Sequence, residues 1–181
     1  MRKNTPFATA AAVITAAATL AACGSLDMGG SAARADLRPT AAISPNPTIG
    51  TVTFTPLEHG VRVAGEVRGL PPGTEHGFHI HEKGDCGDNG NASGGHFNPA
   101  GGTHGKFGAA GSHAGELPSL VADSTGAARF SVDVHAISLT EGAANNVVGR
   151  ALVVHRDRDD YTSQPAGNSG PRIACAVITR G

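Results

Sequence analysis

The 181-residue chain has no tryptophan, a single tyrosine and very little lysine, and its 14 basic residues nearly balance its 15 acidic ones. The formal net charge is −1. A chain without excess positive charge lacks the electrostatic attraction that drives non-specific binding to nucleic acid, so a polybasic nucleic-acid-binding protein is excluded. The high net charge of a charged disordered chain is also absent. The length is that of one domain, and we expect a folded protein.

Glycine and proline are abundant, with 26 and 11 residues, and they favour turns. Between them lie short segments that are β-branched or alternate between apolar and polar residues, which is the pattern of half-buried strands. These segments are residues 33–38, 51–55, 61–67, 76–81, 130–134, 151–154 and 173–178. No segment has a convincing long helical pattern, so the sequence predicts an all-β fold.

The N-terminus carries Arg2 and Lys3, followed by an uncharged, alanine-rich run over residues 7–20. The run is too short to cross a bilayer as a mature helix, and the pattern is typical of an export signal. It ends in Leu20-Ala21-Ala22-Cys23, which resembles a bacterial lipobox, where the cysteine is lipidated and becomes the first mature residue. An ordinary signal peptide followed by a chance cysteine is the alternative.

We therefore predict a lipoprotein signal peptide at residues 1–22, a flexible tether at residues 23–32 and one domain at residues 33–181. Lipid on Cys23 would anchor the protein to a membrane. If Cys23 is lipidated, the two remaining cysteines, Cys86 and Cys175, are free to pair in an oxidising exported compartment.

Nine histidines are a high number for this length. His79 and His81 flank Ile80 in a predicted strand, so their side chains share one face and can converge on one metal ion. The other chemically suggestive residues are His96, His104, His113 and Glu116 in a glycine-rich stretch, and His155 at the end of a predicted strand. This set exceeds the needs of one four-coordinate site, and neutral imidazole suits copper and zinc. The pattern indicates two metal ions, with one ligand shared.

A cupin is a competing all-β interpretation, because the segment from Gly73 to His81 fits the Gly-x5-His-x-His opening of that family. A cupin then requires glutamate four or five positions after the second histidine. Asp85 and Cys86 occupy those positions here, which excludes the cupin interpretation.

Four segments, in order along the chain, resemble the motifs of Cu/Zn superoxide dismutases. They are Gly77-Phe78-His79-Ile80-His81-Glu82, Gly94-Gly95-His96-Phe97-Asn98-Pro99, Val153-Val154-His155 and Gly167-Asn168-Ser169-Gly170-Pro171-Arg172-Ile173-Ala174-Cys175. The resemblance runs from about Ala33 to the C-terminus, and the placement of Cys86 resembles the bacterial periplasmic branch. It implies a flattened eight-stranded Greek-key β-barrel, an immunoglobulin-like sandwich with long metal-binding and electrostatic loops.

The resemblance also implies the site residues. Copper would be held by His79, His81, His96 and His155, and zinc by His96, His104, His113 and Glu116. The family usually has aspartate where this chain has Glu116. Asp159 matches the acid that hydrogen-bonds one copper and one zinc histidine, Arg172 matches the arginine that docks the substrate, and Cys86 and Cys175 match the disulfide cysteines. His59, His76 and His135 match no ligand, and we interpret them as surface or structural residues.

The implied activity is dismutation of superoxide to dioxygen and hydrogen peroxide by copper alternating between Cu(II) and Cu(I), with zinc in a structural role. The implied partners are superoxide and, through Cys23, a membrane of the bacterial envelope, with no nucleic acid; a monomer and a homodimer both stay open. A non-catalytic copper-binding module, a copper-only dismutase and a structural lipoprotein are the alternatives. A copper-only enzyme would lack the zinc ligands, yet His104 and His113 are present.

Overall fold

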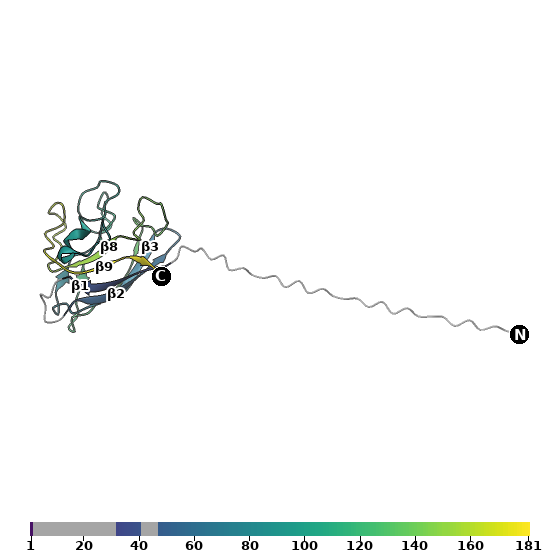
Figure 1. The fold of residues 1–181 in the computed structure, drawn as a ribbon, viewed down its shortest axis with the longest axis horizontal. Coiled ribbons are helices and arrows are strands. Elements are labelled where there is room, and N and C mark those ends of the chain that lie inside the picture. Colours follow the sequence, from purple (N-terminus) through teal and green to yellow (C-terminus); the bar gives the residue numbers. More distant parts are fainter. Residues whose placement is uncertain (2–31, 41–46) are drawn as a thin grey trace.

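A computed structural model describes residue 1, residues 32–40 and residues 47–181 (Figure 1). The predicted signal peptide, Cys23 and nearly all of the predicted tether lie outside these residues, so those predictions and the domain boundaries stay predictions. The described part contains strands β1 Ala33–Pro39, β2 Ile49–Pro56, β3 Val61–Arg68, β4 Glu75–His76, β5 Phe78–His81, β6 Leu120–Val121, β7 Ala128–Val134, β8 Ala151–His155, β9 Arg172–Val177 and β10 Thr179–Arg180, and the 3-10 helix η1 Asp88–Ser93. The predicted all-β fold is confirmed.

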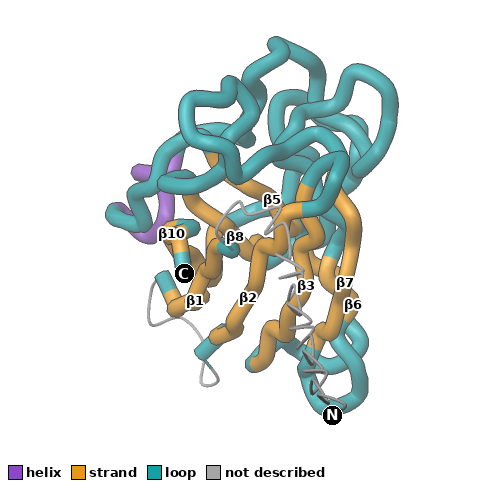
Figure 2. The backbone as a smooth tube through the Cα atoms, turned by 90° about the vertical axis from the view of Figure 1, so that its right-hand side faces the viewer, coloured by secondary structure: helices purple, strands orange, loops and turns teal. Residues whose placement is uncertain are grey.

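One antiparallel sheet of eight strands dominates, in the order β5-β8-β9-β1-β2-β3-β7, with β10 paired to β1. Strands β4 and β6 form a separate two-stranded sheet. The large sheet curls, and its loops gather on one side (Figure 2). Non-consecutive strands lie side by side, as in a Greek key: β9, near the C-terminus, pairs with β1, and β3 pairs with β7. The architecture expected from the family resemblance is confirmed.

The strands place an apolar core on one face of the sheet. In β1, Ala33, Ala35 and Leu37 are buried while the residues between them are more exposed, as the period of two predicts. In β5, Phe78 and Ile80 belong to the core. Burial of each such large side chain stabilises the fold by about 1.5–3 kcal/mol. His79 and His81 alternate with these core residues and are themselves buried.

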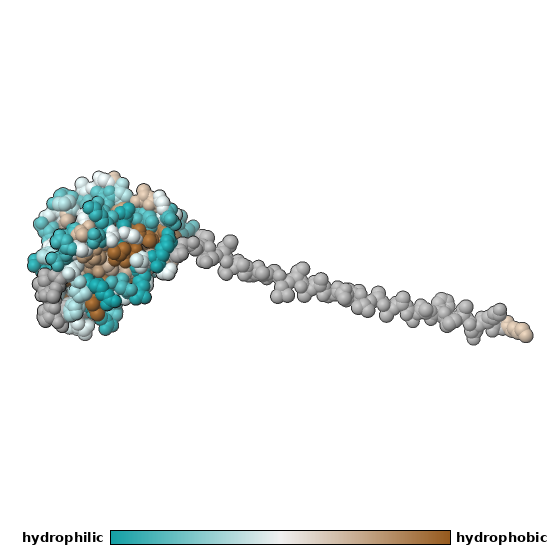
Figure 3. All heavy atoms as spheres, viewed as in Figure 1, coloured by the Kyte–Doolittle hydropathy of each residue, from teal (hydrophilic) through white to brown (hydrophobic). Residues whose placement is uncertain are grey.

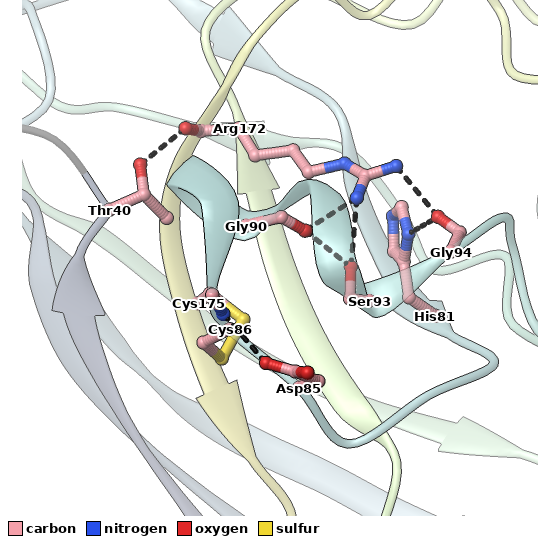
Figure 4. Close-up of a disulfide and its surroundings, with 10 residues drawn as sticks. Thr40, His81, Asp85, Cys86, Gly90, Ser93, Gly94, Arg172 and Cys175 are labelled. Carbon is pink, nitrogen blue, oxygen red and sulfur yellow. Dashed lines mark hydrogen bonds between the residues drawn. A yellow bond between two sulfur atoms is a disulfide. The ribbon is translucent and has the colours of Figure 1, made fainter.

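A disulfide joins Cys86, just before η1, to Cys175 in β9, with the two Cα atoms 5.7 Å apart (Figure 4). The pairing expected from the sequence is confirmed. The bond closes a loop of sequence separation 89. In the chain-entropy model such a crosslink stabilises the native state by about 4–5 kcal/mol. It also fixes the segment around η1 against the sheet.

The face of the molecule shown in Figure 3 is mostly polar, with hydrophobic atoms confined to small areas. Apart from Met1, the described residues leave only Ile49 and Val121 as exposed large hydrophobic side chains. Among the same residues, no helix has the length and apolar character needed to cross a membrane. The outer face of the large sheet carries ion pairs such as Arg62–Asp133, which contribute little to stability because they are exposed.

Candidate metal centre

Six histidines and two acids meet beneath the loops, on the side of β5 and β8 that faces away from the core. One group contains ligand atoms of His79, His81, His96 and His155, all within 4.8 Å of one another. A second group, by the same measure, contains His96, His104, His113 and Glu116. Every member of both groups is buried, and His96 belongs to both. The structure thus brings together all the residues proposed from the sequence as ligands.

The pairing of β5 with β8 positions three of these histidines. His79 lies opposite Val153 in the antiparallel ladder, and a register shift between Val154 and His155 marks the end of β8. The backbone N–H of His155 donates to the carbonyl oxygen of Gly77 at 2.8 Å. Strand β5 and the end of strand β8 therefore bring His79, His81 and His155 close together.

The other edge of β5 is covered by loop segments that carry the remaining ligands. The N–H of Ile80 donates to Gly115 O at 2.8 Å, and the N–H of Phe97 donates to Ile80 O at 2.8 Å. A Cβ on Gly115 would lie 2.3 Å from Ile80 O, so only glycine permits this approach. The approach places His96 and Glu116 next to β5.

Hydrogen bonds define which ring nitrogen of each histidine in the first group is free. His81 Nδ1–H donates to Gly94 O at 2.9 Å, and His155 Nδ1–H donates to Gly170 O at 3.1 Å. A carbonyl oxygen only accepts, so in the neutral rings the lone pairs are on Nε2. The two Nε2 atoms lie 3.2 Å apart. Two lone pairs at this distance repel each other, and a cation bound by both relieves the repulsion.

His79 shows the same arrangement with the opposite nitrogen. Its Nε2–H donates to Asp159 Oδ2 at 2.8 Å, which leaves the lone pair on Nδ1. That Nδ1 and the Nε2 of His96 are buried without a hydrogen-bond partner in the described residues. Orphaned buried nitrogens are costly in a folded protein, and metal coordination satisfies them. Four imidazole nitrogens suit copper, so the first group fits that ion.

In the second group, three imidazole nitrogens surround one carboxylate oxygen. The Nδ1 atoms of His96, His104 and His113 lie 3.1, 2.9 and 2.8 Å from Glu116 Oε1. His104 Nε2–H donates to Asp159 Oδ1 at 2.9 Å, so the Nδ1 of its neutral ring turns a lone pair toward the negative carboxylate. A cation among these atoms converts repulsion into coordination, and three nitrogens with one carboxylate oxygen suit zinc.

His96 and Asp159 connect the two groups. His96 turns Nδ1 toward Glu116 and lines the neighbouring pocket, and its ring stacks on that of His79 with centroids 4.0 Å apart. Asp159, which is 2 % exposed, accepts from His79 with one oxygen and from His104 with the other. Such a carboxylate fixes ring orientation and the position of the proton on both rings.

Burial lowers the pKa of most of these rings, including that of His113 in the second group, and His104 is the exception. Burial, followed by the neighbouring imidazoles, holds the pKa of His79 and His81 well below the usual value, and burial lowers the pKa of His155 to about 4. These rings stay neutral, which is the form that binds metals. For His104, burial acts to lower the pKa, but the hydrogen bond with Asp159 and the charge of Glu116 outweigh it and raise the pKa.

Arg172 lies beside the first group in a pocket of about 260 Å³ that is also lined by His81, His96 and His155. Its guanidinium donates to the carbonyl oxygens of Gly90 and Gly94 (Figure 4). Burial lowers its pKa, yet a guanidinium stays charged at any physiological pH. No acid is among the described residues that line the pocket, so its one fixed charge is positive. The pocket is suited to a small anion.

The structure places the remaining histidines outside both groups. His59 is exposed, and His135 Nδ1–H donates to His59 O at 2.6 Å. His76 is 1 % exposed, and its Nδ1–H donates to the backbone carbonyl of His155 at 2.9 Å.

Sequence analysis missed two residues that contact the site. Gln164 binds both backbone groups of His104, accepting from its N–H at 2.8 Å and donating to its carbonyl at 2.9 Å. Ser93 accepts from Arg172 Nη1 at 3.0 Å. Both contacts join residues at least 60 positions apart, and no local pattern signals them.

Comparison with known proteins shows clear relatives. The profile of the family described as "Copper/zinc superoxide dismutase (SODC)" matches residues 48–178. "Superoxide dismutase [Cu-Zn] 2" of Aquifex aeolicus is 42% identical over 134 residues, covering 72% of this chain and 78% of that protein. "Extracellular superoxide dismutase [Cu-Zn]" of Haemonchus contortus is 40% identical, covering 75% of each chain. The structure titled "Crystal Structure Analysis of the clock protein EA4" superposes with a TM-score of 0.73 at 38% identity, over 83% of this chain and 95% of that one.

Proposed function

This chain belongs to the copper/zinc superoxide dismutases, and from that premise we propose which of its residues carry the dismutation of superoxide to dioxygen and hydrogen peroxide. Copper is held by His79, His81, His96 and His155, and zinc by His96, His104, His113 and Glu116. The observation that carries this assignment is the pair of Nε2 lone pairs of His81 and His155 facing each other at 3.2 Å beside the cationic pocket. When bound, copper supplies the one-electron chemistry by alternating between Cu(II) and Cu(I).

Arg172 binds the anionic substrate. Its guanidinium offers charge and several N–H donors at the wall of a pocket whose other lining residues include His96 and His155. A small anion held there is next to the proposed copper ligands. The guanidinium charge compensates the negative charge of the anion, so binding requires no proton. Pre-positioned positive charge in a partly dry pocket is more effective than the same charge in water.

His96 can carry a proton at Nε2 while that nitrogen is not bound to copper. The Nδ1 of the ring stays directed at Glu116 in the zinc group, so the ring keeps its place whether or not Nε2 is protonated. Nε2 is the nitrogen proposed to face copper, so a proton taken up there when the nitrogen is not bound to the metal lies beside the bound anion. The peroxide product requires protons, and His96 is positioned to deliver one.

Asp159 and Glu116 hold the histidine rings in the orientation that metal binding needs. Asp159 directs the free nitrogen of His79 to the copper group and that of His104 to the zinc group. Glu116 supplies the carboxylate oxygen that the family usually takes from aspartate, and its Oε1 lies within 3.1 Å of all three Nδ1 atoms. These short distances support our proposal that the longer side chain of Glu116 supplies the carboxylate ligand of zinc.

We further propose that the protein is exported and carries lipid on Cys23, which would hold it at a membrane facing the periplasm. The disulfide between Cys86 and Cys175 supports export, because such bonds persist in oxidising compartments. A relative described as extracellular supports it too. Mass spectrometry of the protein from bacterial membranes, with Cys23→Ser as the control, tests the lipid directly.

The experiment that tests the enzymatic assignment loads the purified protein with copper and zinc, counts both metals per chain and assays superoxide dismutation on the same sample. We expect one copper and one zinc per chain and rapid, salt-sensitive turnover. His155→Ala should lose copper and turnover together, whereas Arg172→Ala should keep both metals and lose most of the turnover. Bound metals without turnover in the unaltered protein would overturn the enzymatic role, and full activity without zinc would overturn the role of Glu116.

A further inference from the structure

The guanidinium of Arg172 has five N–H donors, and the described residues accept from only part of them. Nη1 donates to Gly90 O and to Ser93 Oγ, and Nη2 donates to Gly94 O. The N–H on Nε and the second N–H on Nη2 have no acceptor in the described part of the chain. These two groups sit on different nitrogens of one rigid plane, so they form a fork for an anion with two acceptor atoms.

Ser93 provides the second acceptor for Nη1 of Arg172. It is the last residue of η1, and its side chain is 0 % exposed. Its single hydroxyl hydrogen donates to Gly90 O at 2.8 Å, so toward Arg172 the hydroxyl oxygen acts only as an acceptor, at 3.0 Å from Nη1. Ser93 and Gly90 therefore both accept from Nη1, as Figure 4 shows.

Other contacts fix the backbone and the aliphatic stem of Arg172, and only the guanidinium group is left free to turn. The hydroxyl of Thr40 donates to the backbone carbonyl of Arg172, and Cys175, which carries the disulfide, lies in the same strand β9. A Cβ added to Gly90 would lie 3.1 Å from the Arg172 Cβ, so η1 packs directly on the stem of the side chain. Backbone and stem are fixed by these contacts, and the orientation of the guanidinium plane depends on the acceptors at Nη1 and Nη2.

We propose that Ser93 is a positioning residue for anion binding: by occupying Nη1 together with Gly90, its hydroxyl fixes the guanidinium plane so that Nε–H and one Nη2–H face the pocket. This inference rests on the proposed docking role of Arg172. The ligand class that the fork selects is a small anion with two acceptor atoms, such as superoxide or azide. Loss of the hydroxyl removes one of the two acceptors at Nη1 and lets the plane rotate away from the productive orientation.

The test compares Ser93→Ala with the unaltered protein, using azide as the probe. Azide is titrated into the copper- and zinc-loaded protein, and its dissociation constant is read from the visible spectrum of Cu(II). A hydrogen bond to a charged group contributes measurably to the free energy that holds the guanidinium in place. We therefore expect azide to bind Ser93→Ala with a dissociation constant roughly three- to tenfold larger. Ser93→Thr keeps the hydroxyl and should bind azide within about twofold of the unaltered protein, which corresponds to about 0.4 kcal/mol.

A second measurement does not depend on activity or on copper. In diamagnetic protein loaded with zinc alone, NMR reports the exchange of the Arg172 Nη1 hydrogens with solvent, which we expect to be faster in Ser93→Ala. The control is Ser138→Ala, which removes a hydroxyl that accepts from Thr140 N–H at 2.9 Å in a loop outside the pocket. It should change neither azide binding nor Nη1 exchange.

The outcomes separate this inference from the proposed function. Unchanged azide affinity in Ser93→Ala, or an equal loss in Ser138→Ala, overturns the positioning role while the unaltered protein still dismutates superoxide. If the unaltered protein binds both metals but has no turnover, the proposed function fails, and the NMR comparison still decides whether Ser93 orients Arg172.

Discussion

His81 and Arg172 donate to the same acceptor, the carbonyl oxygen of Gly94. His81 Nδ1 lies 2.9 Å from this oxygen and Arg172 Nη2 lies 2.6 Å from it. One proposed copper ligand and the proposed anion-binding residue are therefore positioned by a single peptide group. A displacement of Gly94 changes the metal-binding ring and the docking cation together.

We expect Gly94→Ala to impair both functions at once. Gly94 has a φ of +75°, and an added Cβ would lie 2.3 Å from Glu82 Oε1 and 2.8 Å from Glu82 Cγ. The ψ of −152° places Gly94 in a region that essentially only glycine adopts, so the backbone strain costs about 1–3 kcal/mol, and the crowding shifts the carbonyl. Copper EPR and azide titration should both change. Gly142→Ala is the matched control, because Gly142 has a φ of +77° with nothing within 4 Å of its Cβ position. It should leave the copper spectrum and azide affinity unaltered.

Asp159→Asn should weaken zinc binding strongly while the protein still folds. Asparagine has one acceptor oxygen in place of two, so it cannot accept from His79 and His104 at the same time. Loss of such a partner typically reduces metal affinity 10- to 100-fold. Competition with a chromogenic chelator measures the affinity, with the exposed Asp36→Asn as the control. Equal zinc affinity in Asp159→Asn and the unaltered protein would contradict the bridging role.

Acid should remove zinc before copper. A proton competes with a metal for a ring nitrogen only near and below the pKa of that ring. Burial lowers the pKa of His79 and His81, and lowers that of His155 to about 4, so protons compete for the copper ligands only at low pH. In the zinc group burial lowers the pKa of His113, but the pKa of His104 is raised, and protonation of this one ligand at higher pH is enough to weaken zinc binding.

The measurement for this order is dialysis of the loaded protein at a series of pH values from 7 to 3, followed by metal analysis. The pH of half-release should be higher for zinc than for copper. Release of copper first would contradict the assignment of the low-pKa histidines to the copper group.

Removal of the disulfide should destabilise the metal-free protein and loosen anion binding. The entropy model predicts a loss of about 4–5 kcal/mol for the double substitution Cys86→Ser and Cys175→Ser, which urea unfolding measures. The bond holds the segment that includes η1, and η1 provides the acceptors for Arg172. Azide affinity should therefore fall in the same variant. Lower stability with unchanged azide affinity would show that η1 holds Arg172 without the crosslink.

Much of the strand content was predictable because apolar and polar residues alternate along it. In β1 and β3 the alternation of valine, alanine or leucine with charged residues directly reflects one buried and one exposed face. Strands β4 and β6 are two residues each and pair only with one another, so no periodic pattern could mark them.

The ligand set was predictable from ordered motifs, whereas the contacts that orient it were not. His79 and His81 share a strand face, which spacing alone reveals. The contact between Gln164 and His104 spans 60 positions, and that between Ser93 and Arg172 spans 79. Such contacts depend on how two loops fold over the sheet, and serine or glutamine in a polar loop has no distinguishing pattern.

Strand β1 occupies the middle of the large sheet, with β9 on one side and β2 on the other. The half on the β9 side contains β5, β8 and β9, which carry His79, His81, His155 and Arg172; the other half contains β2, β3 and β7. Strand β1 therefore joins the half of the sheet that carries the proposed copper ligands to the half that carries none of them. Cleavage by a protease before residue 32 would leave every described strand intact, whereas cleavage within β1 would separate the two halves of the barrel.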